Sequence, residues 1–244
     1  MPKEEVIDTH VHLGLSKDGE EITLKEIKEL LNQYPIRSLL LFPIDELDHG
    51  TSYQKSNSKV LKAAEGDKRI YPVFRIDPHE PEAAFREIQR AAKVGARAIK
   101  LHPRSEDFSP HQAEEIIAEI ERLRLPVILH TAHDRHSHPS SWERIFLRHK
   151  KICFILAHAG KDAFREAGEV SERLGNVFLE TSTLSYSRTQ ELLKRVGADK
   201  MVFGSDPPYS HPAIEILKFD LILGKKSPAR RKIFRENAKR IFEI

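Results

Sequence analysis

The chain carries two histidines at alternate positions near its start. His10 and His12 lie in the apolar segment IDTHVHLG, residues 7–14. Side chains of an extended strand alternate between its faces, so both imidazoles would point the same way, about 6.5–7 Å apart. Imidazoles bind zinc and similar ions, and burying two of them among β-branched residues is costly unless they bind something. The pair can therefore converge on one ion, but so short a motif taken alone is more often two solvated surface histidines, and the residues downstream decide between these interpretations.

The elements that must position these histidines follow from the apolar pattern. Short runs rich in Val, Ile and Leu alternate with longer amphipathic stretches of helical spacing. Such continuous runs are typical of parallel strands covered on both faces. The predicted strands cover residues 6–13, 38–42, 70–76, 96–101, 127–130, 152–158, 177–181 and 201–205. Eight strands in 244 residues leave about 30 residues for each βαβ unit, so we expect an α/β fold, a distorted (β/α)8 TIM barrel formed by a single domain of residues 1–244.

Local signals between the strands predict helix starts and one long loop. Thr23 is followed three residues later by Glu26, and Ser187 by Gln190. Each pair has the spacing of a capping box, in which side chain and backbone bond reciprocally at the first turn of a helix. The stretch 43–58 is long for a connection, and we expect it to form a lid.

In a TIM barrel the active site lies at the C-terminal ends of the strands, and polar residues fall at those positions. They are His10 and His12 on the first strand, Lys100 and His102 late in the fourth, His130 and His158 closing the fifth and sixth, and Asp206 after the eighth. A catalytic zinc site uses about three protein ligands and keeps a position for water. The set therefore predicts a catalytic metal site at the barrel mouth.

The composition of the chain limits the classes of molecule that such a site could bind. The 40 Lys and Arg residues against 37 Asp and Glu give a net charge of +3, too even to indicate a nucleic acid or a membrane. The single cysteine, Cys153, excludes an intrachain disulfide framework and fits a reducing, cytoplasmic setting. No apolar run reaches the roughly 18 residues of a membrane span. We expect a small-molecule substrate, no nucleic acid and no membrane contact, and leave a homodimer open.

Six short segments together resemble the amidohydrolase superfamily, and more narrowly its amidohydrolase-2 branch. They are DTHVH at residues 8–12, IKLHP at 99–103, VILH at 127–130, LAHAG at 156–160, GSDP at 204–207 and ENAKR at 236–240. The resemblance runs in unbroken order from residue 7 to residue 240, and the joint occurrence is far more specific than any one segment. It implies a metal-dependent hydrolase with a TIM-barrel fold.

The resemblance also implies roles for individual residues. In that superfamily the residues matching His10, His12, His130 and Asp206 bind a catalytic metal ion, and the one matching His158 binds a second metal or orients the attacking group. We therefore expect one divalent ion, zinc by preference, held by the first four. Asp206 would act as the catalytic base toward water, and His158 would stabilise developing charge.

Lys100 and His102 could contact a second metal ion or the substrate, or could be structural. In binuclear relatives a strand-four lysine is carboxylated and bridges two ions, which Lys100 would permit. If the strand runs to residue 103, however, His102 lies at the mouth and Lys100 about 6.5–7 Å deeper on the same face. There we expect the lysine to pair with a buried carboxylate such as Glu180. This placement favours one metal ion and leaves His158 free of metal.

Two arginines and a histidine-rich loop are further candidates at the mouth. Arg104 and Arg135 lie in loops after the fourth and fifth strands, where a guanidinium could bind a substrate carboxylate through two hydrogen bonds. His136 and His138 lie in the loop 131–139, and we interpret them as solvated.

Other functions stay open on sequence alone. The amidohydrolase-2 branch also resembles non-oxidative decarboxylases and hydratases of aromatic or unsaturated acids, which use the same metal ligands. A TatD-like deoxyribonuclease has similar length, but its strand-four glutamate is replaced here by Lys100, and no basic groove is evident. A non-enzymatic binding barrel would not need every expected ligand. We expect hydrolysis of a small-molecule amide, ester or lactone.

Overall fold

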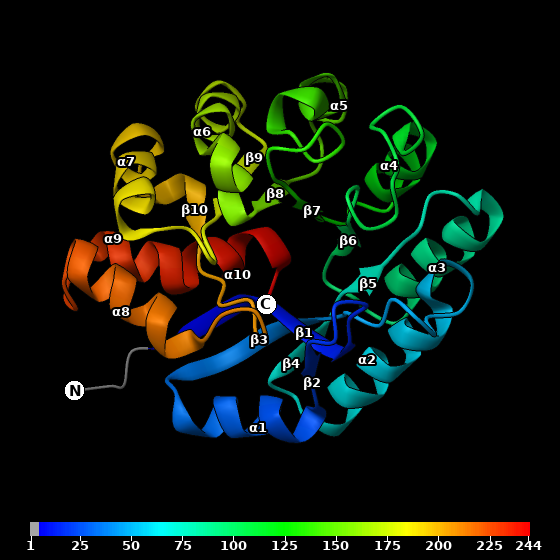
Figure 1. The fold of residues 1–244 in the computed structure, drawn as a ribbon, viewed down its shortest axis with the longest axis horizontal. Helices are drawn as coiled ribbons and strands as arrows, with labels where there is room; N and C mark the ends of the chain where they lie inside the picture. The colour runs from blue at the N-terminus through cyan, green and yellow to red at the C-terminus, as the bar shows by residue number, and fades with distance from the viewer. Residues whose placement is uncertain (1–4) are drawn as a thin grey trace.

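Strands and helices alternate along the chain, and helices surround a ring of parallel strands (Figure 1). The structure, a computed structural model, describes residues 5–244. The strands of the ring are β1 (Val6–Leu15), β3 (Ile36–Pro43), β4 (Ile70–Pro72), β5 (Phe74–Arg75), β6 (Ile99–Leu101), β7 (Val127–His130), β8 (Phe154–Ala157), β9 (Val177–Glu180) and β10 (Met201–Val202). The short β2 (Glu21–Ile22) pairs antiparallel with the end of β1. Every predicted strand is present, most of them shorter than expected.

The helices follow the strands in the order that a TIM barrel requires. They are α1 (Leu24–Gln33), α2 (Gln54–Gly66), α3 (Pro81–Lys93), α4 (Glu114–Arg122), α5 (Glu143–Arg148), α6 (Phe164–Arg173), α7 (Tyr186–Val196), α8 (Pro212–Leu223), α9 (Pro228–Arg231) and α10 (Asn237–Phe242). Short 3-10 turns cover Thr51–Tyr53, Pro139–Trp142, His158–Ala163 and Ala198–Lys200, and a π-helical turn, Lys232–Glu236, precedes α10. No helix within residues 5–244 has the length and apolar character needed to span a membrane.

The barrel closes through two irregular seams. Regular pairing gives one sheet in the order β2-β1-β3-β4 and another in the order β10-β9-β8-β7-β6-β5. The predicted third strand is split between them at Val73, whose N–H donates to the carbonyl of Leu41 at 2.9 Å. At the other seam the Thr9 N–H donates to the Phe203 carbonyl at 2.9 Å. The fold is therefore the expected TIM barrel, distorted at both seams.

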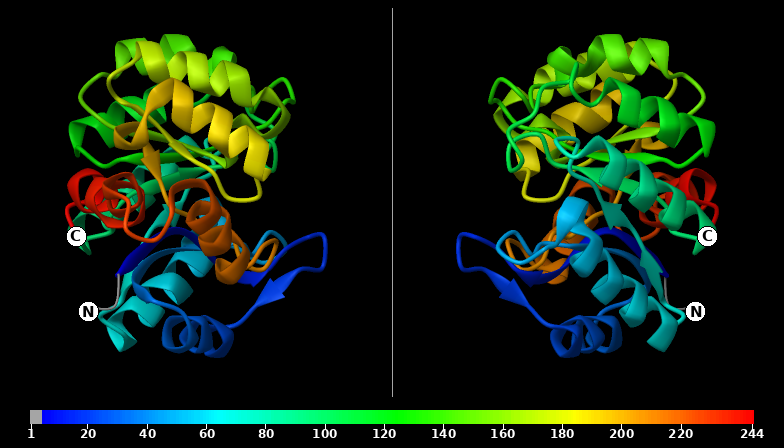
Figure 2. Two further views of the ribbon diagram at one scale, coloured as in Figure 1. Left: turned by 90° about the vertical axis from the view of Figure 1, so that its left-hand side faces the viewer. Right: turned by 90° about the vertical axis from the view of Figure 1, so that its right-hand side faces the viewer.

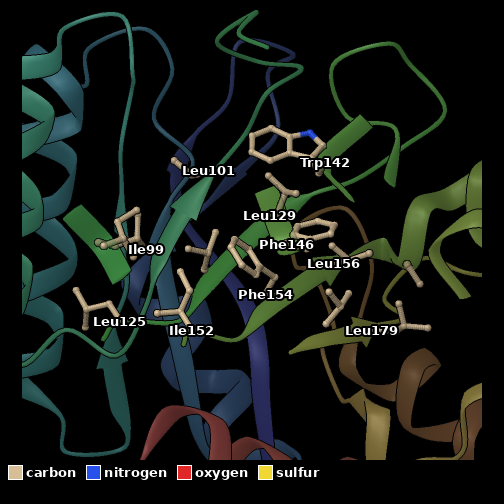
Figure 3. Close-up of a cluster of buried hydrophobic side chains, with 14 of the residues drawn as sticks. Ile99, Leu101, Leu125, Leu129, Trp142, Phe146, Ile152, Phe154, Leu156 and Leu179 are labelled. Atoms are coloured by element: carbon tan, nitrogen blue, oxygen red, sulfur yellow. The ribbon is translucent and has the colours of Figure 1, made fainter. Parts of the chain in front are cut away.

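Side chains on the strands alternate between the surrounding helices and the barrel interior. On β7, Val127 and Leu129 pack in the large outer cluster, part of which Figure 3 shows, whereas Ile128 belongs to an inner cluster. Residues of α10 complete that inner cluster, and Figure 2 places α10 and the β1–β2 hairpin at opposite ends of the barrel. By the same alternation, Lys100 and His130 point into the barrel. The interior is thus apolar near α10 and polar toward the opposite end.

The local sequence signals predicted the start of one helix correctly and the start of another wrongly. Thr23 caps α1 in a complete capping box with Glu26, as predicted. The box predicted at Ser187 is wrong: α7 begins earlier, and its cap is Ser185, whose hydroxyl accepts from the Arg188 N–H. Ser185 lacks the Glu or Gln three residues later that defines a capping box, since that position is Arg188, so the pattern did not single it out. The stretch 43–58 is not all loop, because α2 already begins at Gln54.

Candidate active site

Two ligands predicted on β1 and one predicted after β10 converge inside the barrel. Asp206 Oδ1 lies 3.0 Å from His12 Nε2 and 3.1 Å from His10 Nε2. All three side chains are buried. The Asp206 N–H donates to the His10 carbonyl at 2.8 Å, so the backbone of the seam sets this distance. The two ends of the chain therefore build one cluster of nitrogen and oxygen ligands.

Several buried nitrogen atoms of this cluster suit a metal ion. His130 Nε2 is shielded from solvent and has no hydrogen-bond partner among the described residues, and the 3.1 Å contact of His10 Nε2 with Asp206 Oδ1 lacks the geometry of a hydrogen bond. Burying a polar atom without a partner costs free energy. Two imidazoles and a carboxylate whose ligand atoms all lie within 4.8 Å of one another are a donor set typical of zinc and similar divalent ions. The residues present therefore fit a metal ion.

Glu180 on β9 orients one of these imidazoles. Its Oε2 lies 2.6 Å from His10 Nδ1. The Ser182 hydroxyl donates to the same oxygen at 2.9 Å, and the His158 N–H donates to it at 3.3 Å. Burial alone would raise the pKa of Glu180, but the charge and hydrogen bond of His10, the charge of His158 and the Ser182 N–H lower it to about 2. A carboxylate at Nδ1 directs Nε2 of His10 toward an ion, an arrangement common behind metal-bound histidines.

The predicted pairing of Lys100 with Glu180 is wrong. Glu180 is occupied by His10, and Lys100 Nζ has no hydrogen-bond partner within residues 5–244. The ammonium instead lies 5.0 Å from the centre of the Phe42 ring. Burial lowers the pKa of Lys100 to about 7 against the opposing effect of Asp206. The lysine is thus a buried amine at the base of the site.

Three further predicted histidines gather beside the cluster. The rings of His102 and His130 stack with centroids 3.9 Å apart, and His102 Nδ1 accepts from the Ser105 N–H. His158 Nδ1 lies 3.0 Å from the Ser182 hydroxyl and 3.8 Å from Asp206 Oδ2. Burial lowers the pKa of His158 to about 3, so its ring is neutral. Together with His10 and Glu180 it forms a second group of close ligand atoms.

A cavity of about 290 Å³ opens above these residues at the barrel mouth. It is lined by His10, His12, Lys17, Asp18, Ile44, Glu46, Arg75, Lys100, His102, Arg104, Ser105, His130, His158, Lys161, Thr183, Asp206 and Tyr209. Arg104 therefore lies where the sequence predicted it. The placement predicted for Arg135 is wrong, because this residue lines a separate depression with His136 and Arg144.

A buried arginine on the cavity wall was missed. The side chain of Arg75 on β5 donates to Glu106 from Nε at 2.9 Å and to Glu46 from Nη2 at 2.8 Å. Its guanidinium also lies over the ring of Tyr53, 4.5 Å from the centroid. Through Glu46, which also accepts from the Ser105 hydroxyl, the segment after β3 is fixed over the cavity. One signal was present in the sequence, since a single arginine interrupts the apolar run 70–76.

Lys161 and Thr183, which follow β8 and β9, were also missed. Both line the cavity beside His158, and both have positive φ angles, 50° and 61°. Positive φ angles are uncommon for residues other than glycine, and no local sequence signal predicts them at these two positions.

Comparison with known proteins agrees with the fold and the motifs. The family model Amidohydro_2, described as amidohydrolase, matches residues 7–244. No curated protein sequence matches the chain. An uncharacterized TIM-barrel protein from Bordetella bronchiseptica is similar in structure, with a TM-score of 0.80, 18% identity and coverage of 98% of each chain.

Two similar structures have named activities. One is a 5-carboxyvanillate decarboxylase from Novosphingobium aromaticivorans, complexed with manganese, with a TM-score of 0.78, 14% identity and coverage of 98% of this chain and 96% of that one. The other is a putative 2-pyrone-4,6-dicarboxylic acid hydrolase from Pseudomonas putida, with a TM-score of 0.74, 16% identity and coverage of 98% and 97%. Identities this low show a shared fold, whereas the family model covers nearly the whole chain. The protein therefore belongs to the amidohydrolase-2 family and is an enzyme of that metal-dependent family.

Proposed function

We propose that this enzyme hydrolyses a small-molecule amide, ester or lactone with the help of one divalent metal ion. The observation that carries the proposal is the approach of His10 Nε2 and His12 Nε2 to Asp206 Oδ1, at 3.1 and 3.0 Å, at the base of the cavity. His130 would complete the ligand set from β7. A divalent ion supplies Lewis acidity there, which lowers the pKa of water and polarises a carbonyl.

Asp206 is placed to move the proton that hydrolysis requires. Burial alone would raise its pKa, but His10 and His158 hold the pKa of Asp206 well below its usual value, so the carboxylate is ionised at neutral pH. Oδ1 faces the two β1 histidines, which leaves Oδ2 to take a proton from water and return it to the leaving group. His158, neutral and 3.8 Å from Oδ2, would stabilise charge that develops beside it.

The choice of zinc rests on donor chemistry. Two or three imidazoles and one carboxylate are typical of catalytic zinc, but the same set also binds manganese, the ion held by the decarboxylase from Novosphingobium aromaticivorans. We therefore propose zinc and would test both ions. A cytoplasmic location and a homodimer stay predictions, and light scattering of the purified protein would test the latter.

Non-oxidative decarboxylation of a small carboxylic acid is the second candidate. The observation in its favour is that three basic side chains of the cavity wall, Lys17, Arg104 and Lys161, suit a carboxylate substrate. In this reaction Asp206 would pass a proton from water to the carbon that loses carbon dioxide, leaving hydroxide in place of the water. A deoxyribonuclease is disfavoured by the amidohydrolase-2 match.

A substrate screen of the metal-loaded enzyme separates the two reactions. The protein is treated with a chelator, reloaded with zinc or manganese, and assayed with lactones, amides, esters and aromatic acids. Hydrolysis that depends on the metal supports the first proposal. Release of carbon dioxide without hydrolysis selects the second, and no turnover with either ion would contradict both. Asp206→Asn serves as the inactive control.

A further inference from the structure

The turn that follows β8 has an unusual backbone. Four consecutive residues have positive φ: His158 at 61°, Ala159 at 43°, Gly160 at 82° and Lys161 at 50°. Lys161 combines this φ with a ψ of −109°, far from the left-handed helical region and in a part of conformational space that glycine adopts. An L-residue held there is strained, and such strain is found mainly at functional sites.

Neighbouring elements hold the turn in this conformation. The Gly160 N–H donates to Thr131 Oγ1 at 2.9 Å, and Arg188 donates to the Lys161 carbonyl at 3.3 Å. A side chain at Gly160 would meet Pro139 and Ala167 at 3.2 Å, so the loop is packed against both. The strain at Lys161 is therefore retained because the surrounding structure leaves the loop no relaxed alternative.

The consequence of this conformation is the position of the Lys161 side chain. It lines the cavity beside His158 and Thr183, is only partly exposed, and has no carboxylate partner within the described residues. The adjacent Asp162 is instead paired with Arg188 at 2.8 Å. A partly buried cation without a partner on a cavity wall gains free energy when an anion binds beside it.

We propose that Lys161, together with the Thr183 hydroxyl, binds a carboxylate group of the substrate, and that the strained turn serves to hold the lysine there. The proposed metal ligands lie on β1, at the end of β7 and after β10, whereas these two residues follow β8 and β9, between the last two of those positions around the barrel. A substrate bound between the two sides would thus have its reacting carbon at the metal and its carboxylate beside His158. That this carboxylate belongs to a substrate rests on the proposed function, whereas the binding of a carboxylate by Lys161 and Thr183 does not.

Calorimetry with a small aromatic acid tests the binding site directly. Benzoate and uncharged benzyl alcohol are titrated into the zinc-loaded protein, into Lys161→Met and into Lys225→Met, a control at an exposed lysine beyond α8 that does not line the cavity. We expect benzoate to bind Lys161→Met roughly tenfold or more weakly, since a charged hydrogen bond is lost, with benzyl alcohol unchanged. Equal affinity for benzoate in all three proteins, or no binding by the wild type at millimolar concentration, would overturn the assignment.

Stability measurements test the strain. Lys161→Ala and Lys161→Gly both remove the charge, but only glycine relieves the backbone strain, because it adopts these φ and ψ angles without a clash of its own Cβ. We expect Lys161→Gly to have the higher melting temperature, the reverse of the order that chain entropy alone would give. A Lys161→Ala protein that is as stable as Lys161→Gly, or more stable, would show that the turn stores no strain.

Turnover separates this proposal from the proposed function. If no substrate is converted but benzoate binding still depends on Lys161, the function is wrong and the carboxylate site stands. If a substrate is hydrolysed and kcat/KM is the same in Lys161→Met, hydrolysis stands and the role of Lys161 in recognising substrate is wrong.

Discussion

Glu180 Oε2 lies 2.6 Å from His10 Nδ1 inside the barrel, with both side chains shielded from solvent. The carboxylate holds the ring so that Nε2 faces Asp206. Loss of such a carboxylate behind a ligand histidine typically costs 10–100-fold in metal affinity. We therefore expect Glu180→Gln to bind zinc roughly 10–100-fold more weakly, as measured by competition with a chelator.

A matched control exists elsewhere in the chain. His149 Nδ1 lies 3.0 Å from Glu121 Oε2, and neither residue lines the cavity. Glu121→Gln should leave zinc affinity unchanged. A folded Glu180→Gln protein with wild-type affinity would show that the carboxylate does not position His10 for a metal ion.

Asp206→Asn should be folded and nearly inactive. The amide keeps the size of the side chain but cannot take a proton at Oδ2, and loss of a general base typically lowers the rate by about 10²–10⁴-fold. His10→Ala should lower both activity and metal content. Steady-state kinetics and metal analysis check the two variants, and full metal occupancy with an unchanged rate in either one would refute the site.

The metal-free protein should lose stability on the acidic side of pH 6.5. Burial lowers the pKa of His12 to about 4 and that of His158 to about 3, from the usual 6.5 of an exposed histidine. Below pH 6.5 the unfolded chain therefore binds protons that the folded chain excludes, so the free energy of unfolding falls as the pH drops toward 4. Above pH 6.5 these two residues add no pH dependence.

Urea unfolding of chelator-treated protein across that range provides the measurement. His12→Asn should flatten the profile, whereas His111→Asn, at an exposed position, should not. A free energy of unfolding that is constant over the range would contradict the buried, neutral state of these rings.

Arg75→Met should destabilise the protein by about 3–5 kcal/mol, because it leaves the buried Glu106 carboxylate and the partly buried Glu46 without their cation. The double variant Arg75→Met/Glu106→Gln should recover part of that loss. Arg122→Met removes an exposed partner of Glu119 and should cost far less. Comparable losses in the free energy of unfolding for the two single arginine variants would show that burial of Arg75 contributes nothing.

One metal ion per chain is expected from the position of Lys100. Its Nζ lies over the Phe42 ring at the base of the site, and His158 Nδ1 is engaged with Ser182. Metal analysis of the loaded enzyme should give a ratio of one. A ratio of two, with a carboxylated Lys100 detected by mass spectrometry, would establish a binuclear site and make His158 a ligand.

The sequence alone determined the order of strands and helices and the residues at the strand ends. Apolar runs and capping signals such as Thr23 with Glu26 depend on local spacing, and the interior face of a strand follows from alternation. His10, His12 and Asp206 could therefore be named before their distances were known. Their family motifs added roles that spacing by itself does not supply.

Only the tertiary structure decided which of these groups pair. Glu180 was expected to neutralise Lys100, yet it bonds to His10, because a buried carboxylate interacts with the donor that the barrel places nearest to it. Arg75 lies on β5, whereas Glu46 follows β3 and Glu106 follows β6, so no spacing in the sequence links them. The position of Lys161 depends on backbone angles that the surrounding contacts impose. These relationships depend on distances across the barrel, which local periodicity does not encode.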